Sequence, residues 1–294
     1  MKSPAYVKGL WHGDVLVAVF GTVRNWNFAG ETPEAIEANN PGVSADIAEV
    51  MDQLEIHRAL VPRPAFHAMV CEPSQLTVER LPRFFRGVDA DGVLLTESGD
   101  AYILASADCL TTVVYDCYQH TLVALHCGRN ALIDRERLAG KPPRQYASVI
   151  EAGLDALNRY ARVDPSKLLV FLAAGIGPET FVHPTTEMVP GPDGNPVPNK
   201  YAAANAQLIR HLTQKYAMHA GQLRDQPPIV TDSVQGKIDL VALAKVQLWK
   251  LGIPFDNMVW DGFDTATSSD GSEPLFHSNR RNALMRNLVV VKLN

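Results

Sequence analysis

Four short runs of apolar and β-branched residues lie between Gly92 and Cys127, and this block constrains the fold more than any other part of the sequence. The runs read GVLLT, AYILASA, TTVVYDC and TLVALHC, and turn-forming pieces such as ESGD and YQH separate them. Such a pattern predicts four short strands. Strands joined by short turns are expected to pair antiparallel with their neighbours in the sequence, so a β-sheet is predicted in the middle of the chain.

Helices and further strands are predicted on both sides of this block, from apolar residues at helical spacing and from β-branched runs. The predicted helices span residues 45–60, 144–163, 201–217 and 238–252, and the predicted strands span residues 14–23, 168–178 and 288–293. Asp239 is an N-cap candidate, and Gly252 ends the fourth helix. Core-type patterns continue on both sides of the turn-rich stretch 190–199, so we predict one domain over residues 1–294.

The composition restricts the classes of function. The chain has 294 residues, 46% of them hydrophobic and 20% charged, as in ordinary globular proteins. A net charge of −5 without runs of lysine or arginine argues against nucleic acid as a partner. No stretch has the roughly 18 consecutive apolar residues of a membrane span, and the N-terminal segment lacks a signal-peptide pattern. We therefore expect a cytoplasmic protein with no membrane partner, either a monomer or a homodimer.

Cys109 and His126 are candidate metal ligands. They lie at the ends of two predicted strands joined by a short turn, and antiparallel pairing brings such ends together. A thiolate and an imidazole suit Zn²⁺ or copper. The alternative is a buried cysteine beside a core histidine, since free cysteine is among the most buried residue types. Cys127 adjoins His126 on a strand, so its side chain is expected on the opposite face.

Six short motifs follow one another along the chain, among them Ala-Asp-Cys, Ala-x-His-x-Gly and Ile-Gly-Pro. They are the segments Val88–Gly92, Ala107–Leu110, Ala124–Gly128, Gly175–Pro178, Ile238–Leu240 and Phe276–Arg281. In type and order they resemble the motifs of the laccase-domain (YfiH-like) family, whose members are described as multicopper polyphenol oxidoreductases or purine nucleoside phosphorylases. Each motif is only moderately specific, but six in sequence are hard to obtain by chance. The chain is identified as a divergent member.

The resemblance implies a third metal ligand. In the family this ligand comes from a Gln-Val-His-Gly segment ahead of the Asp-Ala-Asp motif, and Met69–Glu72 falls on that segment with Cys71 in place of the histidine. The implied set is Cys71, Cys109 and His126, with His67 as the reserve candidate. Two thiolates and one imidazole would neutralise Zn²⁺ and make it a weaker Lewis acid than one thiolate and two imidazoles would. A fourth protein ligand would make the site purely structural.

The resemblance also implies four arginines for anion binding, because a guanidinium donates two parallel hydrogen bonds to phosphate. Arg129 stands one position from the arginine that follows the family's histidine motif, and such a slip on a strand changes the face to which a side chain points. Arg24 resembles the arginine of an N-terminal Phe-x-Thr-Arg motif, with one extra residue before it. The resemblance implies a catalytic role for Arg24, as it does for the three metal ligands. Arg280 and Arg281 keep the spacing of the C-terminal element. The alternative for each is ordinary surface charge.

The family's fold and activities follow as expectations. The resemblance implies an α+β fold, an αββα-type sandwich in which helices flank mixed sheets. It implies a zinc-dependent phosphorylase that takes phosphate and a purine nucleoside (adenosine, inosine or methylthioadenosine), with adenosine deaminase activity as a second reaction. One alternative is a copper-dependent polyphenol oxidoreductase, although nine scattered histidines are few for several coppers. The other is a catalytically silent, metal-stabilised binding protein, which the departures from the family motifs favour.

Overall fold

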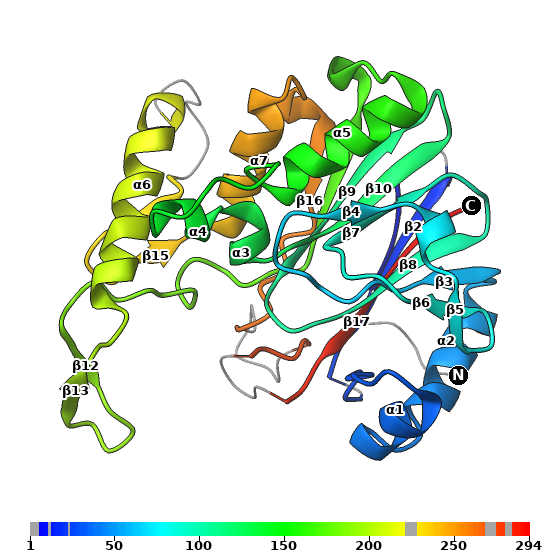
Figure 1. The fold of residues 1–294 in the computed structure, drawn as a ribbon, viewed down its shortest axis with the longest axis horizontal. Coiled ribbons are helices and arrows are strands. Elements are labelled where there is room, and N and C mark those ends of the chain that lie inside the picture. Colours follow the sequence, from blue (N-terminus) through cyan, green and yellow to red (C-terminus); the bar gives the residue numbers. More distant parts are fainter. Residues whose placement is uncertain (1–5, 11–12, 23, 221–227, 268–274, 280–283) are drawn as a thin grey trace.

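Two β-sheets packed face to face form the centre of the protein in a computed structural model (Figure 1). The structure describes residues 6–10, 13–22, 24–220, 228–267, 275–279 and 284–294. Among these residues the first sheet has seven strands in the order β1-β2-β17-β8-β3-β6-β5. Their bounds are β1 Tyr6–Leu10, β2 Val15–Phe20, β17 Asn287–Leu293, β8 Asp100–Ser106, β3 Arg58–Leu60, β6 Phe84–Arg86 and β5 Val78–Leu81.

The second sheet has six strands within the same described ranges, in the order β16-β11-β9-β10-β7-β4. Their bounds are β16 Met258–Trp260, β11 Leu169–Ala173, β9 Leu110–Asp116, β10 Thr121–Cys127, β7 Gly92–Leu95 and β4 Val70–Cys71. Each sheet combines parallel pairs, such as β3 with β8 and β4 with β7, and antiparallel pairs. Both sheets are therefore mixed.

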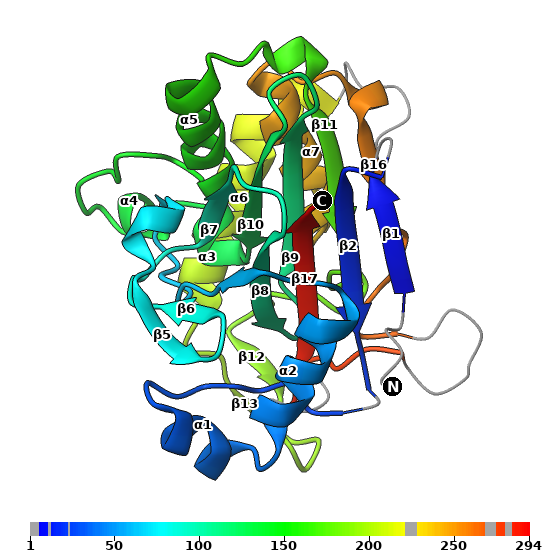
Figure 2. The ribbon, with the colours of Figure 1, turned by 90° about the vertical axis from the view of Figure 1, so that its right-hand side faces the viewer.

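Helices cover the outer face of each sheet, which gives four layers (Figures 1 and 2). The apolar residues of α1 (Pro33–Asn39) and α2 (Val43–Gln53) share a core with β2, β8 and β17 of the first sheet. The second sheet packs against α3 Arg129–Leu132, α5 Val149–Ala161, α6 Ala202–Ala220 and α7 Leu240–Lys250. This arrangement confirms the expected αββα-type sandwich. No described helix combines the length and the apolar character needed to cross a membrane.

Strand β8 shows how the sequence supplies two cores at once. Tyr102 and Leu104 point into the core between the sheets, whereas Ala101 and Ile103 pack toward α1 and α2. Successive side chains of a strand alternate between its faces, and here both faces are covered. Strands β9 and β10 are buried along their whole length for the same reason, so neither shows an alternation of apolar and polar residues.

The predicted pairing of the four central strands is wrong for β8. Strands β9 and β10 pair antiparallel as expected, but β7 pairs with β10, and β8 lies in the other sheet between β17 and β3. The chain crosses between the sheets just before β8, where Gly99 has a φ of +87° and a Cβ would lie 2.2 Å from His57 Nδ1. Because both faces of these strands are apolar, the sequence pattern does not determine which sheet each strand joins.

Several predicted elements are confirmed with small changes of bounds. The three strands predicted outside the central block of the sequence form β2, β11 and β17. Helix α5 begins after Ser148, whose hydroxyl accepts a hydrogen bond from Glu151 N, and α7 begins after the predicted cap Asp239, whose carboxylate accepts one from Ala242 N at 2.8 Å. Each cap satisfies an amide that the first helical turn leaves without a partner.

Two segments depart from their predicted structure. The helix predicted over 45–60 ends at Gln53, because Glu55 adopts a φ of +52° and the chain then forms β3. The stretch predicted as a loop contains a hairpin, β12 (Met188–Pro190) paired with β13 (Pro196–Pro198). A second small hairpin, β14 (Val230–Asp232) with β15 (Lys237–Ile238), precedes α7, and a short helix, α4 (Arg135–Leu138), follows α3.

Candidate functional site

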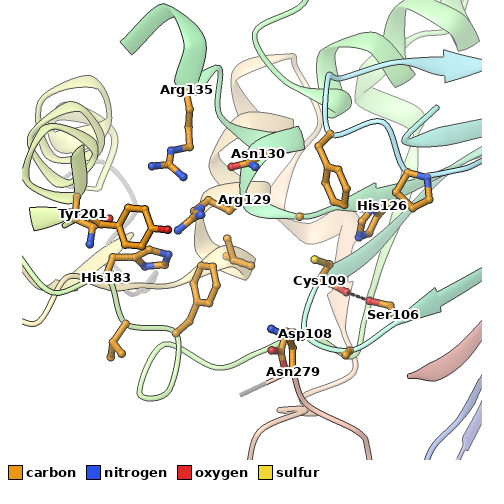
Figure 3. Close-up of a pocket in the computed structure, with 18 of the residues that line it drawn as sticks. Ser106, Asp108, Cys109, His126, Arg129, Asn130, Arg135, His183, Tyr201 and Asn279 are labelled. Atoms are coloured by element: carbon orange, nitrogen blue, oxygen red, sulfur yellow. Dashed lines mark hydrogen bonds between the residues drawn. The ribbon is translucent and has the colours of Figure 1, made fainter. Parts of the chain in front are cut away.

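A pocket of about 990 Å³ opens where β8 and β10 end and β9 begins. That volume lies in the range of sites for small organic ligands. Figure 3 shows Cys109 and His126 at one end of the pocket, and it shows Arg129, His183 and Tyr201 grouped at the other. The pocket therefore joins a thiol and imidazole pair to a cationic and aromatic wall.

Strand pairing brings Cys109 and His126 together. His126 is level with Thr111 across β10 and β9, and Cys109 immediately precedes β9. Gly128 provides the space for both side chains, since a Cβ on it would lie 3.0 Å from Cys109 Sγ and 3.7 Å from His126 Cε1. A larger residue at position 128 would displace the thiol.

Burial determines the protonation of this pair. Burial, together with the neighbouring Asp108 carboxylate, raises the pKa of Cys109 to about 12. Desolvation lowers the pKa of His126 to about 4, although the Asp91 carboxylate acts in the opposite direction. At neutral pH the pair is therefore a protonated thiol beside a neutral imidazole. His126 Nδ1 is buried and has no hydrogen-bond partner in the part of the chain that the structure describes.

Cys71 lies apart from this pair, so the structure does not assemble the predicted set of three ligands. Cys71 on β4 is level with Val93 of β7, and Val93 is level with Ala124 of β10. Strand β7 therefore separates Cys71 from β10 by two strand spacings, or about 10 Å. The Cys71 thiol belongs to the core between the sheets and donates to Gly92 O at 3.4 Å. Burial raises its pKa to about 12.

A buried carboxylate shapes the loop that precedes β4. Asp91 is completely buried, and its side chain accepts hydrogen bonds from Phe66 N at 2.6 Å, His67 N at 2.8 Å and Ala68 N at 2.9 Å. Its backbone oxygen accepts a further bond from His126 N at 2.6 Å, so one residue ties the loop to β10. Phe66 and Ala68 have φ values of +57° and +60°. This left-handed conformation costs a non-glycine residue about 1 to 2 kcal/mol, which the bonds to Asp91 offset.

Phe66 is the residue of this loop that faces His126. The two ring centroids lie 5.7 Å apart with the planes at 65°, an edge-to-face contact. Phe66 lines the pocket, whereas the reserve candidate His67 is exposed outside the pocket lining. The segment that was expected to supply a third ligand thus reaches the pair with an apolar ring.

Arg129 lines the pocket from the first turn of a helix. Strand β10 ends at Cys127 and Gly128 caps α3, so the one-position slip does not turn the side chain away as it would on a strand. Arg286, which precedes β17, lines the same pocket, and the charges of Arg286 and Arg129 act against burial to lower the pKa of Cys109. Arg135 of α4 adds a third guanidinium to the lining.

Arg24, a further predicted arginine, lies away from the pocket. Arg24 forms an ion pair with Asp46 of α2 and donates to Pro41 O at 2.8 Å, so its guanidinium holds the loop after β2 against α2 instead of lining the pocket. Arg280 and Arg281 lie outside the described residues.

Several pocket residues could not be identified from the motifs. Phe181 and His183 form an edge-to-face pair with ring centroids 4.6 Å apart, and they follow the Gly-x-Gly-Pro turn that ends the β11 segment. Tyr201 is the first residue of the helix predicted over 201–217, but it precedes α6, is 57% exposed and lines the pocket. For Tyr201 the sequence offered one indication of an exposed position, namely an aromatic residue immediately before a run of alanines.

A family model described as multi-copper polyphenol oxidoreductase laccase matches residues 29–292. The chain belongs to this family. No curated protein matches this laccase-family chain.

Solved structures of family proteins share its fold. YfiH of Bacillus licheniformis is 13% identical with a TM-score of 0.64, and the match covers 95% of this chain and 93% of that one. A Neisseria meningitidis protein of the DUF152 family is 16% identical with a TM-score of 0.61 and 98% coverage of both chains. YlmD of Geobacillus stearothermophilus is 15% identical with a TM-score of 0.62, covering 96% of this chain and 92% of its own. Likeness at such identity supports the fold alone.

The laccase family's name implies copper, and the donor set of this chain can be compared with that expectation. The pocket offers Cys109 Sγ and the His126 imidazole, whose buried Nδ1 has no other partner in the described structure. Among the described residues, however, no group of three or more His, Cys, Asp or Glu side chains is arranged to hold a metal. Zinc and copper sites commonly use at least three protein ligands. The residues present therefore do not fit a metal of that kind.

Proposed function

We propose that the pocket binds a purine nucleoside together with phosphate and transfers the ribosyl group to phosphate. The position of Arg129 supports this proposal most strongly, since its guanidinium lines the same pocket as Arg135 and Arg286, between the Cys109 and His126 pair and the aromatic wall. Guanidinium groups remain charged at neutral pH and bind phosphate oxygens through paired N–H donors. Three arginines in one small pocket suit a phosphate dianion.

The aromatic wall suits the purine base. Tyr201 and His183 lie beside Arg129, and Phe181 packs against His183 (Figure 3). A purine has a flat π face that stacks favourably on aromatic side chains. Asn130 Oδ1 also lines this region, is buried and has no hydrogen-bond partner among the described residues, so it offers an acceptor for an N–H group of a ligand.

In the proposed reaction a phosphate oxygen attacks the anomeric carbon of the ribose. The glycosidic C–N bond breaks, its electron pair leaves with the purine, and the base takes up a proton from solvent, which gives ribose 1-phosphate and free purine. The arginines hold the phosphate in line and stabilise its charge. No step uses zinc or copper, because the donor set does not fit them. Adenosine deamination, which the resemblance implied as a second reaction, is not part of the proposal, because a metal would have to supply its hydroxide.

A nucleoside-binding protein without turnover is the second candidate. The edge-to-face contact of Phe66 with His126 favours it, because an apolar ring occupies one side of the imidazole. An imidazole covered in this way is less available to a reacting group.

The experiment compares inosine, adenosine and methylthioadenosine, each with and without orthophosphate. Equal amounts of free base and ribose 1-phosphate, formed only with phosphate, support the phosphorylase. Saturable nucleoside binding by calorimetry without base release supports the second candidate. Failure to bind any nucleoside, in folded protein, contradicts both.

Added Cu²⁺ should give no sustained phenol oxidation, since no three donor side chains among the described residues are arranged to hold a metal. We expect a single burst of oxygen uptake, limited by the thiols of the half-buried residues Cys109 and Cys117: Cu²⁺ oxidises these thiols to disulfide, and oxygen reoxidises the Cu⁺ formed until the thiols are consumed. Oxygen uptake with a phenol measures this, and Cys117→Ser should shrink the burst. Continued oxygen uptake over many turnovers per chain would establish an oxidase and contradict the proposed metal-free phosphorylase.

A further inference from the structure

We infer that this chain does not take a metal ion at Cys109 and His126, because Phe66 fills the place of the third ligand, and that a histidine at position 66 would complete the site. The inference does not rest on the proposed nucleoside chemistry, since it concerns metal binding and is tested by metal binding.

The ring geometry places Phe66 where a ligand would stand. Two imidazoles bound tetrahedrally to one zinc at about 2.0 Å have ring centres about 5 Å apart. The Phe66 and His126 centroids are 5.7 Å apart, and the planes are steeply inclined at 65°. The phenyl ring has the placement of a ligand but no lone pair. It therefore occupies the position of the third ligand without supplying a donor atom to a metal ion.

The backbone at Phe66 is held independently of its side chain. Asp91 binds the amides of Phe66, His67 and Ala68, and its backbone oxygen binds His126 N. A new side chain at position 66 therefore starts from the same Cα position, beside the same imidazole. Histidine tolerates the left-handed conformation of position 66 better than phenylalanine, so Phe66→His should fold.

The neighbouring donors cannot take over the role of a third ligand. Cys71 is separated from His126 by β7 and donates to Gly92 O inside the core. His67 is exposed outside the pocket lining, although its amide shares the same carboxylate as Phe66. Of the three residues whose amides bind Asp91, Phe66, 44% exposed, is the one that lines the pocket.

The test measures zinc content by elemental analysis after equilibrium dialysis against Zn²⁺, and Co²⁺ binding by the thiolate-to-cobalt absorption band. Wild type should retain little zinc, and its melting temperature should not respond to zinc. Phe66→His should bind about one zinc per chain, show the cobalt band and melt at higher temperature with zinc. Adding Cys109→Ser to Phe66→His should remove the band, whereas adding Cys71→Ser should leave it.

Stoichiometric zinc in wild type that disappears with Cys109→Ser would overturn the inference. So would a folded Phe66→His protein that binds no zinc. If Phe66→His does not fold, Phe66→Cys places an alternative donor at the same position. The zinc content of the wild-type protein tests the inference without any variant.

Discussion

Replacing Asp91 by alanine is expected to lower the free energy of unfolding by about 3 to 5 kcal/mol, the largest stability effect that we predict for this chain. The substitution leaves three buried or half-buried amides, those of Phe66, His67 and Ala68, without their acceptor. It also removes the bonds that offset the left-handed conformation of two non-glycine residues. Urea denaturation of wild type and variant measures the difference.

Asp89→Ala is the matched control, because it removes a carboxylate two positions away that is 60% exposed and pairs with Arg63. An exposed ion pair of this kind contributes less than about 1 kcal/mol. Equal losses from Asp91→Ala and Asp89→Ala would show that the buried carboxylate does not hold the loop.

Arg129→Ala is expected to lower kcat/KM for phosphate about 100-fold, since a positioned donor to a charged group supplies roughly that much to a transition state. The side chain lines the same pocket as Cys109, and its charge acts to lower the pKa of that thiol. Arg129→Lys should recover only part of the loss, because an ammonium keeps the charge but cannot donate two parallel hydrogen bonds. Steady-state kinetics at varied phosphate provide the measurement.

Arg24→Ala serves as the control for Arg129→Ala, because Arg24 pairs with Asp46 on α2 and lies outside the pocket lining. Its kcat/KM for phosphate should equal that of wild type after correction for folded protein. A loss as large as that of Arg129→Ala would show that the phosphate site lies elsewhere.

Local features were predictable where a short stretch of sequence determines the structure by itself. Asp239 caps α7, as its side chain and position require, and three apolar runs form β2, β11 and β17. The partners of buried strands were not predictable in the same way. Strand β8 is apolar on both faces, so its sequence fits either sheet, and only the packing of the whole chain assigns it to β17.

In the candidate site, too, the residues placed by local pairing were predictable, and those placed by distant contacts were not. Cys109 and His126 meet because a short turn fixes the register of β9 with β10. Cys71 does not join them, since its place depends on the pairing of β4 with a strand 21 residues further along the chain. Phe66 could not be recognised as the facing residue, because a carboxylate distant in sequence sets the direction of its loop.

Inosine cleavage by chelator-treated protein tests whether the pocket cleaves a nucleoside with phosphate and without a metal. The protein is supplied with ¹⁸O-labelled orthophosphate, and the products are followed by mass spectrometry. We expect ribose 1-phosphate carrying the labelled oxygens, formed at the same rate before and after chelation. Release of free ribose, or activity that vanishes on chelation and returns with zinc, would rule out the proposed metal-free phosphorolysis.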